Sequence, residues 1–442
     1  MFLVVYEGAL RKWVFLGFQA EIFFVKDVIL VVAYVIFLAS PKPPGAHLKA
    51  IAPLRILLLA SLVYFLFELV NPNSPSMLVS VVGLKNYLLY VPIAFLVPYM
   101  FTSSEDLEHK LRKYALLMTP CVALGLVQFA LPPTHWLNGY LSHDSEALLM
   151  GAVFGAANAN VRSVGTFSYI GGYTEFLTVM FYLVAGLVAK NRWKISGNAW
   201  LLAYLVITVA AMFTTGSRGP IWWLIATWPL ALIIWGRAGL LSMKTAGRMF
   251  LAAAAIWILA QFLAADAFDA YSFRAEQAND TISRLLAPLD QTWAALFASG
   301  PIGTGMGSTS GSALSIMGTN EFWWFNGLFF EVESARVLQE VGIVGLVLVY
   351  AMRVWLLVKA MSLSRNFRNP LYIGLGGVMA CLFLQDLVIG FVVNNATVAI
   401  YHWFAAGLLF AMYRLEVAES ARTREQPVSD RGRLEAFRPI NA

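Results

Sequence analysis

The sequence predicts an all-α polytopic membrane protein with about 11 transmembrane helices and a long, partly helical outer loop between spans 8 and 9. Hydrophobic residues make up 59% of the 442-residue chain, charged residues only 13%, and the mean hydropathy is +0.69. Soluble domains are about one quarter charged, so this chain carries too little charge to cover several of them. Aromatic residues reach 14%, which is typical of rings anchored at a membrane–water boundary. The composition argues against a soluble enzyme, a disordered scaffold or a disulfide-stapled secreted domain.

Eleven stretches of the chain are apolar enough to be spans, since a bilayer core requires about 20 residues of helix. Proline-containing loops at 41–45, 72–75 and 132–133 separate the first of them, and residues 216–219 form a tight turn between the short sixth and seventh. The predicted spans are 22–39, 53–70, 78–98, 114–131, 169–189, 200–214, 220–235, 248–265, 337–357, 371–393 and 397–414.

Basic residues predict the orientation, because Lys and Arg accumulate on the cytoplasmic side. Alternating spans place 22 of the 31 Lys and Arg on one side, Arg353 among them, and nine on the other. The N-terminus is therefore expected outside and the C-terminus inside. Residues 1–6 are too few to span and are interpreted as the tail of a segment that lies mostly before them.

The predicted organisation has four parts. Residues 266–336 are far longer than the roughly 12–15 residues beyond which structureless loops are uncommon, so a functional role is expected there. The parts are spans 1–8 in 1–265 with a small outer segment at 132–168, the large outer loop at 266–336, spans 9–11 in 337–415, and a disordered cytoplasmic tail at 416–442.

Ionisable side chains inside the predicted spans lie in their outer halves, and no comparable charged group is found in the inner half of any span. Such groups cost roughly 2.5–3.5 kcal/mol each on insertion scales, so they are kept mainly for function. We expect a water-filled cavity open to the outer face, lined by Glu175, Glu340, Asp386 and His402; snorkelling to the interface is the alternative for single residues. Asp386 and His402 are also candidates for a structural pair. The full set is Lys26, Asp27, Glu68, Lys85, Glu175, Glu340, Asp386 and His402.

Four arginines face outside against the positive-inside trend: Arg162, Arg218, Arg284 and Arg336. A planar guanidinium binds phosphate oxygens in pairs, so these residues are candidate ligands of an anionic lipid diphosphate. Salt bridges with acids of the large loop are the alternative. No metal or cofactor site is predicted, because Cys121 and Cys381 stand alone in apolar runs and the two histidines of the small outer segment, His135 and His143, have no spaced carboxylate.

Four local patterns occur in order on the predicted outer side. Together they resemble the O-antigen ligase/polymerase superfamily of bacterial envelope glycosyltransferases, over roughly residues 55–415. The patterns are Arg162-x-x-Gly165-Thr166-Phe167, Thr215-Gly216-Ser217-Arg218-Gly219, Arg284 followed by Pro301-Ile302-Gly303-Thr304-Gly305-Met306-Gly307, and Leu338-x-Glu340-x-Gly342-x-x-Gly345.

The resemblance implies a metal-independent, inverting transfer of a glycan from a polyprenyl diphosphate carrier to a sugar hydroxyl, at the outer face of the bacterial inner membrane. It implies that Arg162, Arg218 and Arg284 bind the diphosphate. The catalytic histidine of the ligases is absent; its place falls at Glu331, with Glu333 two residues on. A carboxylate can replace an imidazole as general base, so both acids are catalytic candidates, and pairing with Arg336 is the alternative.

The leading hypothesis is polymerisation of lipid-linked repeat units into O-antigen or exopolysaccharide. The expected partners are the polyprenyl-diphosphate-linked glycan, membrane lipid and other polysaccharide-assembly proteins such as a chain-length regulator, with no nucleic acid. A ligase that transfers finished glycan to a lipid or protein is the nearest alternative. A polysaccharide transporter or flippase is the second.

Overall fold

The computed structural model describes residues 1–41, 51–141, 148–149, 152–154, 160–277, 281–317 and 330–425. It is a bundle of helices with two small antiparallel hairpins, β1 (Tyr140–Leu141) with β2 (Leu148–Leu149) and β3 (Val153–Phe154) with β4 (Asn160–Val161). The helices are α1 (Phe2–Ala9), α2 (Gln19–Ala39), α4 (Ala52–Glu68), α5 (Met77–Leu88), α6 (Ile93–Leu96), α7 (Ser104–Phe129), α8 (Ile170–Lys190), α9 (Ala199–Thr214), α10 (Gly219–Arg237), α11 (Met243–Leu263), α12 (Ala265–Gln277), α13 (Thr281–Ser299), α14 (Gly311–Met317), α16 (Glu333–Asn366), α17 (Pro370–Val388) and α18 (Ala396–Glu425).

Eight helices in the described ranges are long and apolar enough to cross a membrane, which confirms an all-α multi-pass membrane protein. They are α2, the run from α5 to Tyr99, α8, α10, α11, α16, α17 and α18. The other three predicted spans coincide with α4 and α9, which have 17 and 16 residues, and with α7, whose first turns are charged. The count of eleven spans and the sidedness stay predictions.

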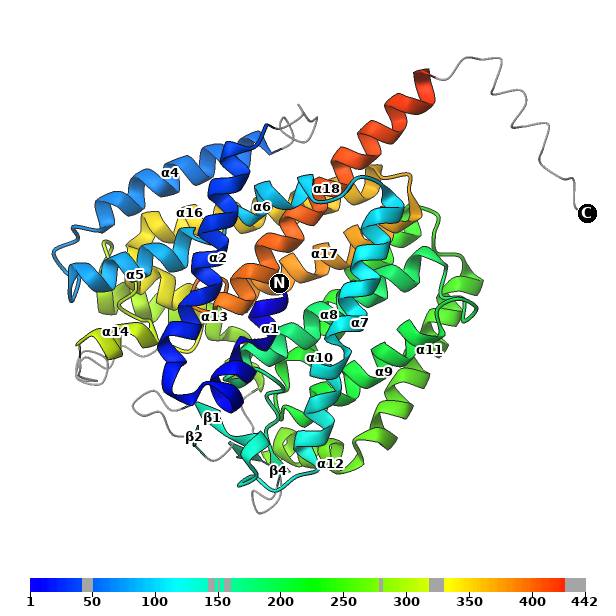
Figure 1. Ribbon diagram of the computed structural model, residues 1–442, viewed down its shortest axis with the longest axis horizontal. Coiled ribbons are helices and arrows are strands. Elements are labelled where there is room, and N and C mark those ends of the chain that lie inside the picture. Colours follow the sequence, from blue (N-terminus) through cyan, green and yellow to red (C-terminus); the bar gives the residue numbers. More distant parts are fainter. Residues whose placement is uncertain are drawn as a thin grey trace, which may run out of the picture.

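The centre of the bundle is formed by α8 and α17, whose apolar stretches are 89% and 83% buried inside the protein. Glycines bring the two helices together: a side chain on Gly374 would lie 2.5 Å from the carbonyl oxygen of Gly186. At the margin, the corresponding stretches of α2 and α11 are only 11% and 17% buried, so their apolar faces are available to lipid. Figure 1 shows α8 and α17 in the middle and α11 at the right edge.

The helix α16 reverses direction at Val341 and Gly342. A carboxylate oxygen of Glu333 lies 2.5 Å from a guanidinium nitrogen of Arg353, yet 20 residues of straight helix would separate them by about 30 Å. Both residues at the break leave helical geometry, and Gly342 has φ +61° and ψ −167°. The predicted span 337–357 therefore straddles a fold-back, and the uninterrupted helix begins only after Gly342.

Residues 301–307, which we call the glycine loop, fill this break. A broken helix frees backbone groups that a membrane interior cannot hydrate, and the loop supplies partners for them. Gly303, Gly305 and Gly307 all have positive φ, as a chain that turns so tightly against other backbone requires. Three backbone hydrogen bonds join loop and break: Ile343 N–H to Pro301 C=O (3.0 Å), Thr304 N–H to Gln339 C=O (2.7 Å) and Gly305 N–H to Glu340 C=O (2.9 Å).

The C-terminal helix is longer than predicted. It continues to Glu425 and projects at the upper right of Figure 1, so residues 416–425 are helical rather than part of a disordered tail. The carboxylate of Glu416 accepts a hydrogen bond from the backbone N–H of Arg368, and that of Glu419 accepts one from the Tyr372 hydroxyl. Residues 426–442 lie outside the described residues.

The N-terminal segment packs against residues 163–168. The Thr166 hydroxyl donates to the carbonyl of Val5 (2.5 Å), and a side chain on Gly8 would lie 2.4 Å from the Thr166 carbonyl oxygen. Lys12, between α1 and α2, is 1% exposed and donates to the carbonyl of Gly165 at 3.2 Å. Because burial disfavours the ammonium ion, the pKa of Lys12 falls from 10.5 to about 7.

Replacing Gly342 by alanine should destabilise the protein by at least about 2 kcal/mol, because its backbone conformation is essentially restricted to glycine. The added methyl would also lie 2.1 Å from the Pro301 carbonyl oxygen. Thermal unfolding in detergent measures the loss. The matched control is Gly247→Ala in α11, where nothing lies within 4 Å and a gain of about 0.5–1 kcal/mol is expected. Equal midpoints for both variants would contradict the prediction.

Lys12 should make stability rise with pH between about 7 and 10. In that window the unfolded chain holds a proton that the folded chain has released, so raising the pH favours folding. We expect the unfolding midpoint of Lys12→Met to rise less over this range than that of the wild type. The exposed Lys113→Met serves as control and should follow the wild type. Parallel curves for Lys12→Met and the wild type would refute the effect.

Candidate functional site

Arg162 and Arg218 meet the same turn at the end of α9. Arg162 follows β4 and its Nε donates to the carbonyl of Thr215 at 3.0 Å. Arg218 stands three residues further on, where α10 begins. Gly165 and Gly216 have positive φ and pack against the rings of Tyr173 and Phe154. The two segments are joined by Ser163 N–H, which donates to the carbonyl of Thr214 at 3.0 Å. The structure therefore brings the first two predicted arginine motifs together, as one half-buried cluster.

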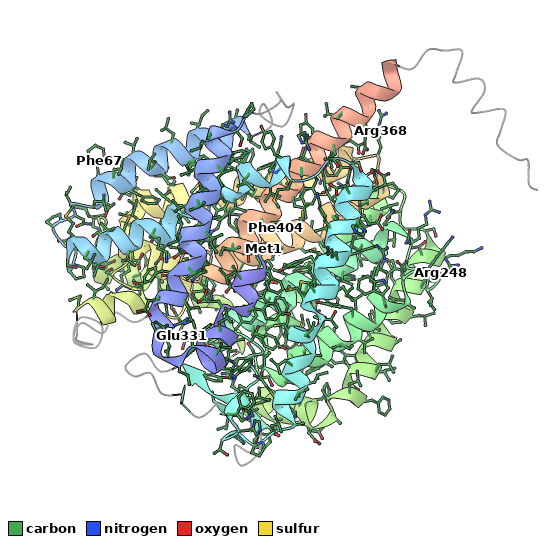
Figure 2. All side chains as sticks on the ribbon, viewed as in Figure 1. Met1, Phe67, Arg248, Glu331, Arg368 and Phe404 are labelled. Atoms are coloured by element: carbon green, nitrogen blue, oxygen red, sulfur yellow. The ribbon has the colours of Figure 1, made fainter. Side chains whose placement is uncertain are left out.

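Arg284, Glu331 and Arg336 form a second cluster, between α13 and the start of α16. A guanidinium nitrogen of Arg284 lies 3.9 Å from a Glu331 carboxylate oxygen, and these side chains are 60% and 63% exposed. Arg336 Nε donates to the carbonyl of Phe330 at 2.7 Å, next to Glu331. Arg284 thus contacts the accessible Glu331 carboxylate, and Arg336 binds the backbone of the preceding residue. Figure 2 shows Glu331 at the opposite end of the molecule from Arg368.

The backbone around Glu331 is held by α13. The Gln291 side-chain oxygen accepts from the N–H groups of Glu331 and Val332 at 2.8 and 3.1 Å. Beside it, the Thr292 hydroxyl donates to Ser334 at 2.6 Å. These contacts fix the main chain while leaving the Glu331 carboxylate exposed. The sequence pattern did not reveal Gln291 or Thr292, because nothing in the neighbouring sequence indicates that a side chain here binds the backbone 40 residues further on.

Glu333 has a different environment from Glu331, although only one residue separates them. It is 2% exposed. One oxygen pairs with Arg353 at 2.5 Å, and the other accepts from the N–H groups of Val393 and Asn394 at 2.5 and 3.1 Å. A carboxylate fully occupied in this way is placed to hold structure. Of the two predicted bases, only Glu331 is open to a substrate.

The buried partner of Glu333 is Arg353. The sequence predicts Arg353 on the cytoplasmic side, but the residue is 2% exposed and lies inside the bundle. Besides Glu333, it donates to the carbonyl of Asp386 at 3.2 Å and stacks over Tyr350 at 4.8 Å from the ring centre. The fold-back of α16 explains the difference, because it carries Glu333 down beside Arg353. A lone arginine in the apolar run 337–357 was the only available signal.

Glu340 joins three elements rather than lining open space. Tyr87 of α5 donates its hydroxyl to one carboxylate oxygen at 2.8 Å. Thr309, just after the glycine loop, donates its N–H and hydroxyl to the other at 2.9 and 2.5 Å. With 1% exposure, Glu340 anchors the loop to the break in α16.

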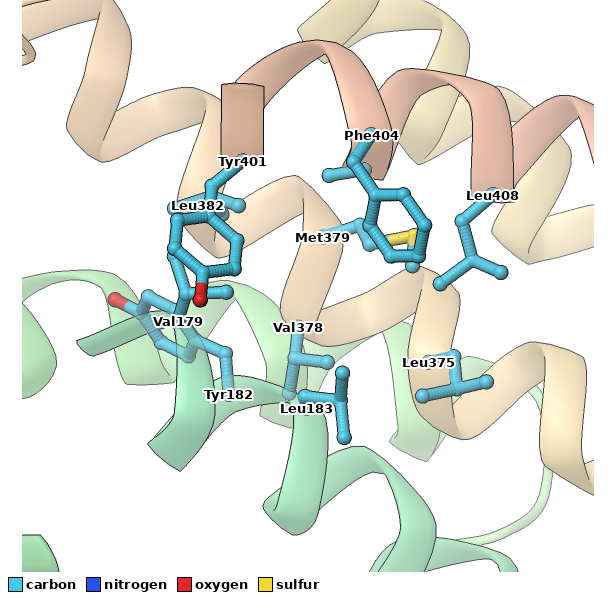
Figure 3. A pocket seen from close by; sticks show the side chains of 11 residues that line it. Val179, Tyr182, Leu183, Leu375, Val378, Met379, Leu382, Tyr401, Phe404 and Leu408 are labelled. Atoms are coloured by element: carbon cyan, nitrogen blue, oxygen red, sulfur yellow. The ribbon is translucent and has the colours of Figure 1, made fainter. Parts of the chain in front are cut away.

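Asp386 and His402 form the pair that the sequence suggested, with 2.7 Å between carboxylate oxygen and Nδ1 and no exposure of either residue. Glu175 lies near them and is 8% exposed. One polar atom of each of the three residues has no hydrogen-bond partner within the described part of the chain. One turn away lies an apolar cavity of about 30 Å³ between α8, α17 and α18, bounded by Val179, Leu382 and others (Figure 3).

Neither this cavity nor the larger one described below is lined by Glu175, Glu340, Asp386 or His402. The water-filled cavity therefore stays a prediction.

The charged residues of α2 and α5 that the sequence singled out have charged partners. Lys26 pairs with Glu7 at 2.9 Å and Lys85 with Asp27 at 2.5 Å. The same Asp27 accepts from the Tyr90 hydroxyl at 2.7 Å. Buried charges are tolerated when they are paired in this way, so this group connects helices and gives no sign of a ligand site.

No group of three or more His, Cys, Asp or Glu side chains among the described residues could hold a metal ion. Cys121 and Cys381 are buried free thiols. His143 lies outside the described residues.

The substitutions Glu333→Gln and Glu331→Gln should have different effects on stability, because the Glu333 carboxylate is buried in an ion pair and the Glu331 carboxylate is exposed. Leaving Arg353 buried without its counter-charge should cost about 3–5 kcal/mol, whereas an exposed Glu331→Gln change should stay within about 0.5 kcal/mol. Thermal unfolding in detergent measures both. The double variant Glu333→Gln/Arg353→Gln should recover part of the loss, because no unpaired charge remains. Equal midpoints for the two single variants would overturn the assignment.

Comparison with family models and with curated proteins found no match. The resemblance to the O-antigen ligase/polymerase superfamily therefore rests on the four ordered patterns, and function has to be argued from the two arginine clusters.

Proposed function

We propose that this protein polymerises polyprenyl-diphosphate-linked oligosaccharide units into O-antigen or exopolysaccharide at the outer face of the bacterial inner membrane. The observation that carries the proposal is the exposed Glu331 carboxylate beside Arg284, with Arg336 bound to the carbonyl of the preceding residue. Glu331 occupies the position of the ligase base by motif spacing, and Arg284 is one of the arginines that the resemblance assigns to the diphosphate.

The reaction follows from these two kinds of side chain. Glu331 accepts the proton of an acceptor sugar hydroxyl, whose oxygen bonds to the anomeric carbon of the donor glycan from the face opposite the diphosphate. The bond from that carbon to the diphosphate oxygen breaks, and the electron pair leaves with the diphosphate. Arg284 and Arg336 stabilise the charge that builds on this leaving group. The configuration is inverted and no metal takes part.

The loose Arg284–Glu331 contact suits this chemistry. An ion pair 3.9 Å long and more than half exposed contributes at most about 1 kcal/mol. A diphosphate, with more charge and paired oxygens, competes for the guanidinium. Substrate binding would then release the carboxylate to act as base. Glu333, whose oxygens are engaged by Arg353 and two backbone N–H groups, has no such freedom.

Two arginine clusters favour polymerisation over ligation. A polymerase holds two lipid-linked substrates, a donor chain and an acceptor unit, and therefore two diphosphates. Arg162 and Arg218 at the end of α9 would hold one, and Arg284 with Arg336 the other. A ligase that transfers glycan to a different acceptor needs only one such site.

Arg284→Ala and Glu331→Gln should each lower the polymerisation rate about 10²–10⁴-fold, with normal insertion and folding. The assay adds lipid-linked repeat units to the purified protein and measures chain length by gel. Asp290→Asn, an exposed acid on α13, is the matched control and should keep wild-type ladders.

The outcomes separate the alternatives. Ladders formed without any other acceptor support a polymerase. Transfer only after a lipid or protein acceptor is added would establish a ligase. Unchanged chain lengths in both Arg284→Ala and Glu331→Gln would contradict the proposed site. If the wild type forms no polymer but moves the lipid-linked substrate across the membrane of vesicles, the protein is a transporter.

A further inference from the structure

A groove of about 760 Å³ opens between α9 and α11, at the end of α9 opposite to the Arg162–Arg218 cluster. Leu202, Ala203 and Val206 line it at the beginning of α9, whereas Arg162 contacts Thr215 at the end of that helix. The groove therefore faces the other membrane leaflet, and the inference drawn from it does not depend on the proposed reaction. Figure 2 places Arg248, which lines the groove, far from Glu331.

The groove has the length of one leaflet. On α11 its wall is formed by Arg248, Leu251, Ala252, Ala255 and Leu259, whose spacing of three and four residues puts them on one face. From Arg248 to Leu259 the helix rises about 16 Å, close to half of a roughly 30 Å hydrocarbon core. From Leu251 to Leu259 the α11 side chains that line the groove are all apolar. The groove therefore matches an extended acyl chain that starts at the membrane surface.

The groove is open from the side. Leu251 and Leu259 are 67% and 50% exposed, so a lipid can enter laterally from the bilayer. Three alanines, at 203, 252 and 255, keep the space between the helices free of bulky side chains. The apolar length of the groove contacts lipid tails and needs no polar partner. The end of the groove next to Lys194 and Arg248, which we call its mouth, is charged.

Two basic residues stand at the mouth. Lys194 precedes α9 and Arg248 lies in the second turn of α11; both are exposed and line the groove. Neither side chain forms an ion pair with any residue that the structure describes. Both belong to the side that the sequence predicts as cytoplasmic, where basic pockets between helices bind anionic lipid headgroups.

The backbone at the mouth is strained. Arg192 and Trp193 are the two non-glycine residues with positive φ in the described chain, at +52° and +57°. This conformation is unusual for such side chains, and it places Trp193 in the wall of the groove, 94% buried against Trp228. Strain of this kind concentrates at ligand sites, and a tryptophan at a membrane–water boundary is a usual lipid anchor.

We propose that the α9–α11 groove binds one anionic glycerophospholipid. Its phosphate lies between Lys194 and Arg248, beside the Trp193 indole, and one acyl chain extends along α11 towards Leu259. The ligand is a resident lipid of the leaflet on the side that the sequence predicts as cytoplasmic. Charge selects the headgroup, and the length of the groove selects a single chain in one leaflet.

The test counts lipids bound to the delipidated full-length protein by native mass spectrometry, with phosphatidylglycerol and phosphatidylcholine of identical chains. We expect one phosphatidylglycerol bound in clear preference to phosphatidylcholine. Lys194→Gln and Arg248→Gln should each weaken phosphatidylglycerol binding about fivefold, since one basic residue near an anionic surface contributes on that order. Lys244→Gln, an exposed lysine in the first turn of α11 outside the groove, removes the same charge and should change nothing.

A second variant tests the acyl chain independently of charge. Ala255→Phe fills the groove along α11 and should abolish binding of either lipid while the protein still folds and inserts normally. Equal binding of the two lipids, an equal loss in Lys244→Gln, or undiminished binding in a folded Ala255→Phe would each overturn the proposal. If Ala255→Phe does not fold, the three charge variants decide.

Discussion

The reversal of α16 at Val341 and Gly342 is the constraint on which the end of the protein around Glu331 and Glu340 depends. A helix broken within a membrane protein must find new partners for its backbone groups, and the glycine loop supplies them with three hydrogen bonds. The Tyr64 hydroxyl donates to the Val341 carbonyl at 2.8 Å and completes the set. Only glycine at 342 permits the approach, because any side chain would collide with the loop.

The same reversal positions the candidate catalytic group. It carries Glu333 to Arg353 and thereby ties the beginning of α16 to residues 393–394 beyond α17. Glu331 lies two residues before this anchor and is held on its other side by Gln291. The backbone of Glu331 is thus held between α13 and the start of α16. Preorganised placement of this kind is what electrostatic and acid–base catalysis require.

Most of the ionisable residues that lie within the predicted spans, where a charge is costly to bury, hold helices together. Asp27 meets Lys85 and Tyr90, Glu340 meets Tyr87 and Thr309, and Asp386 meets His402. Their positions could be read from the chain because a charge in an apolar run is conspicuous. Their partners could not, because Tyr87 and Glu340 are separated by 253 residues and hydropathy carries no information about which spans adjoin.

By itself, the sequence determined the multi-pass helical fold and the arginines and glycines that bear on function. Apolar length and backbone freedom are local properties, so they can be read residue by residue. Only the tertiary structure decided that Glu331 is exposed while Glu333 is buried, that Arg353 belongs inside the bundle, and that the four arginines form two clusters. The burial of Glu333 beside Arg353 depends on a chain reversal whose hydrogen bonds come from residues 301–305, some forty positions away. The Arg162–Arg218 cluster depends on contacts between residues 162–163 and 214–215. No local pattern encodes such pairings.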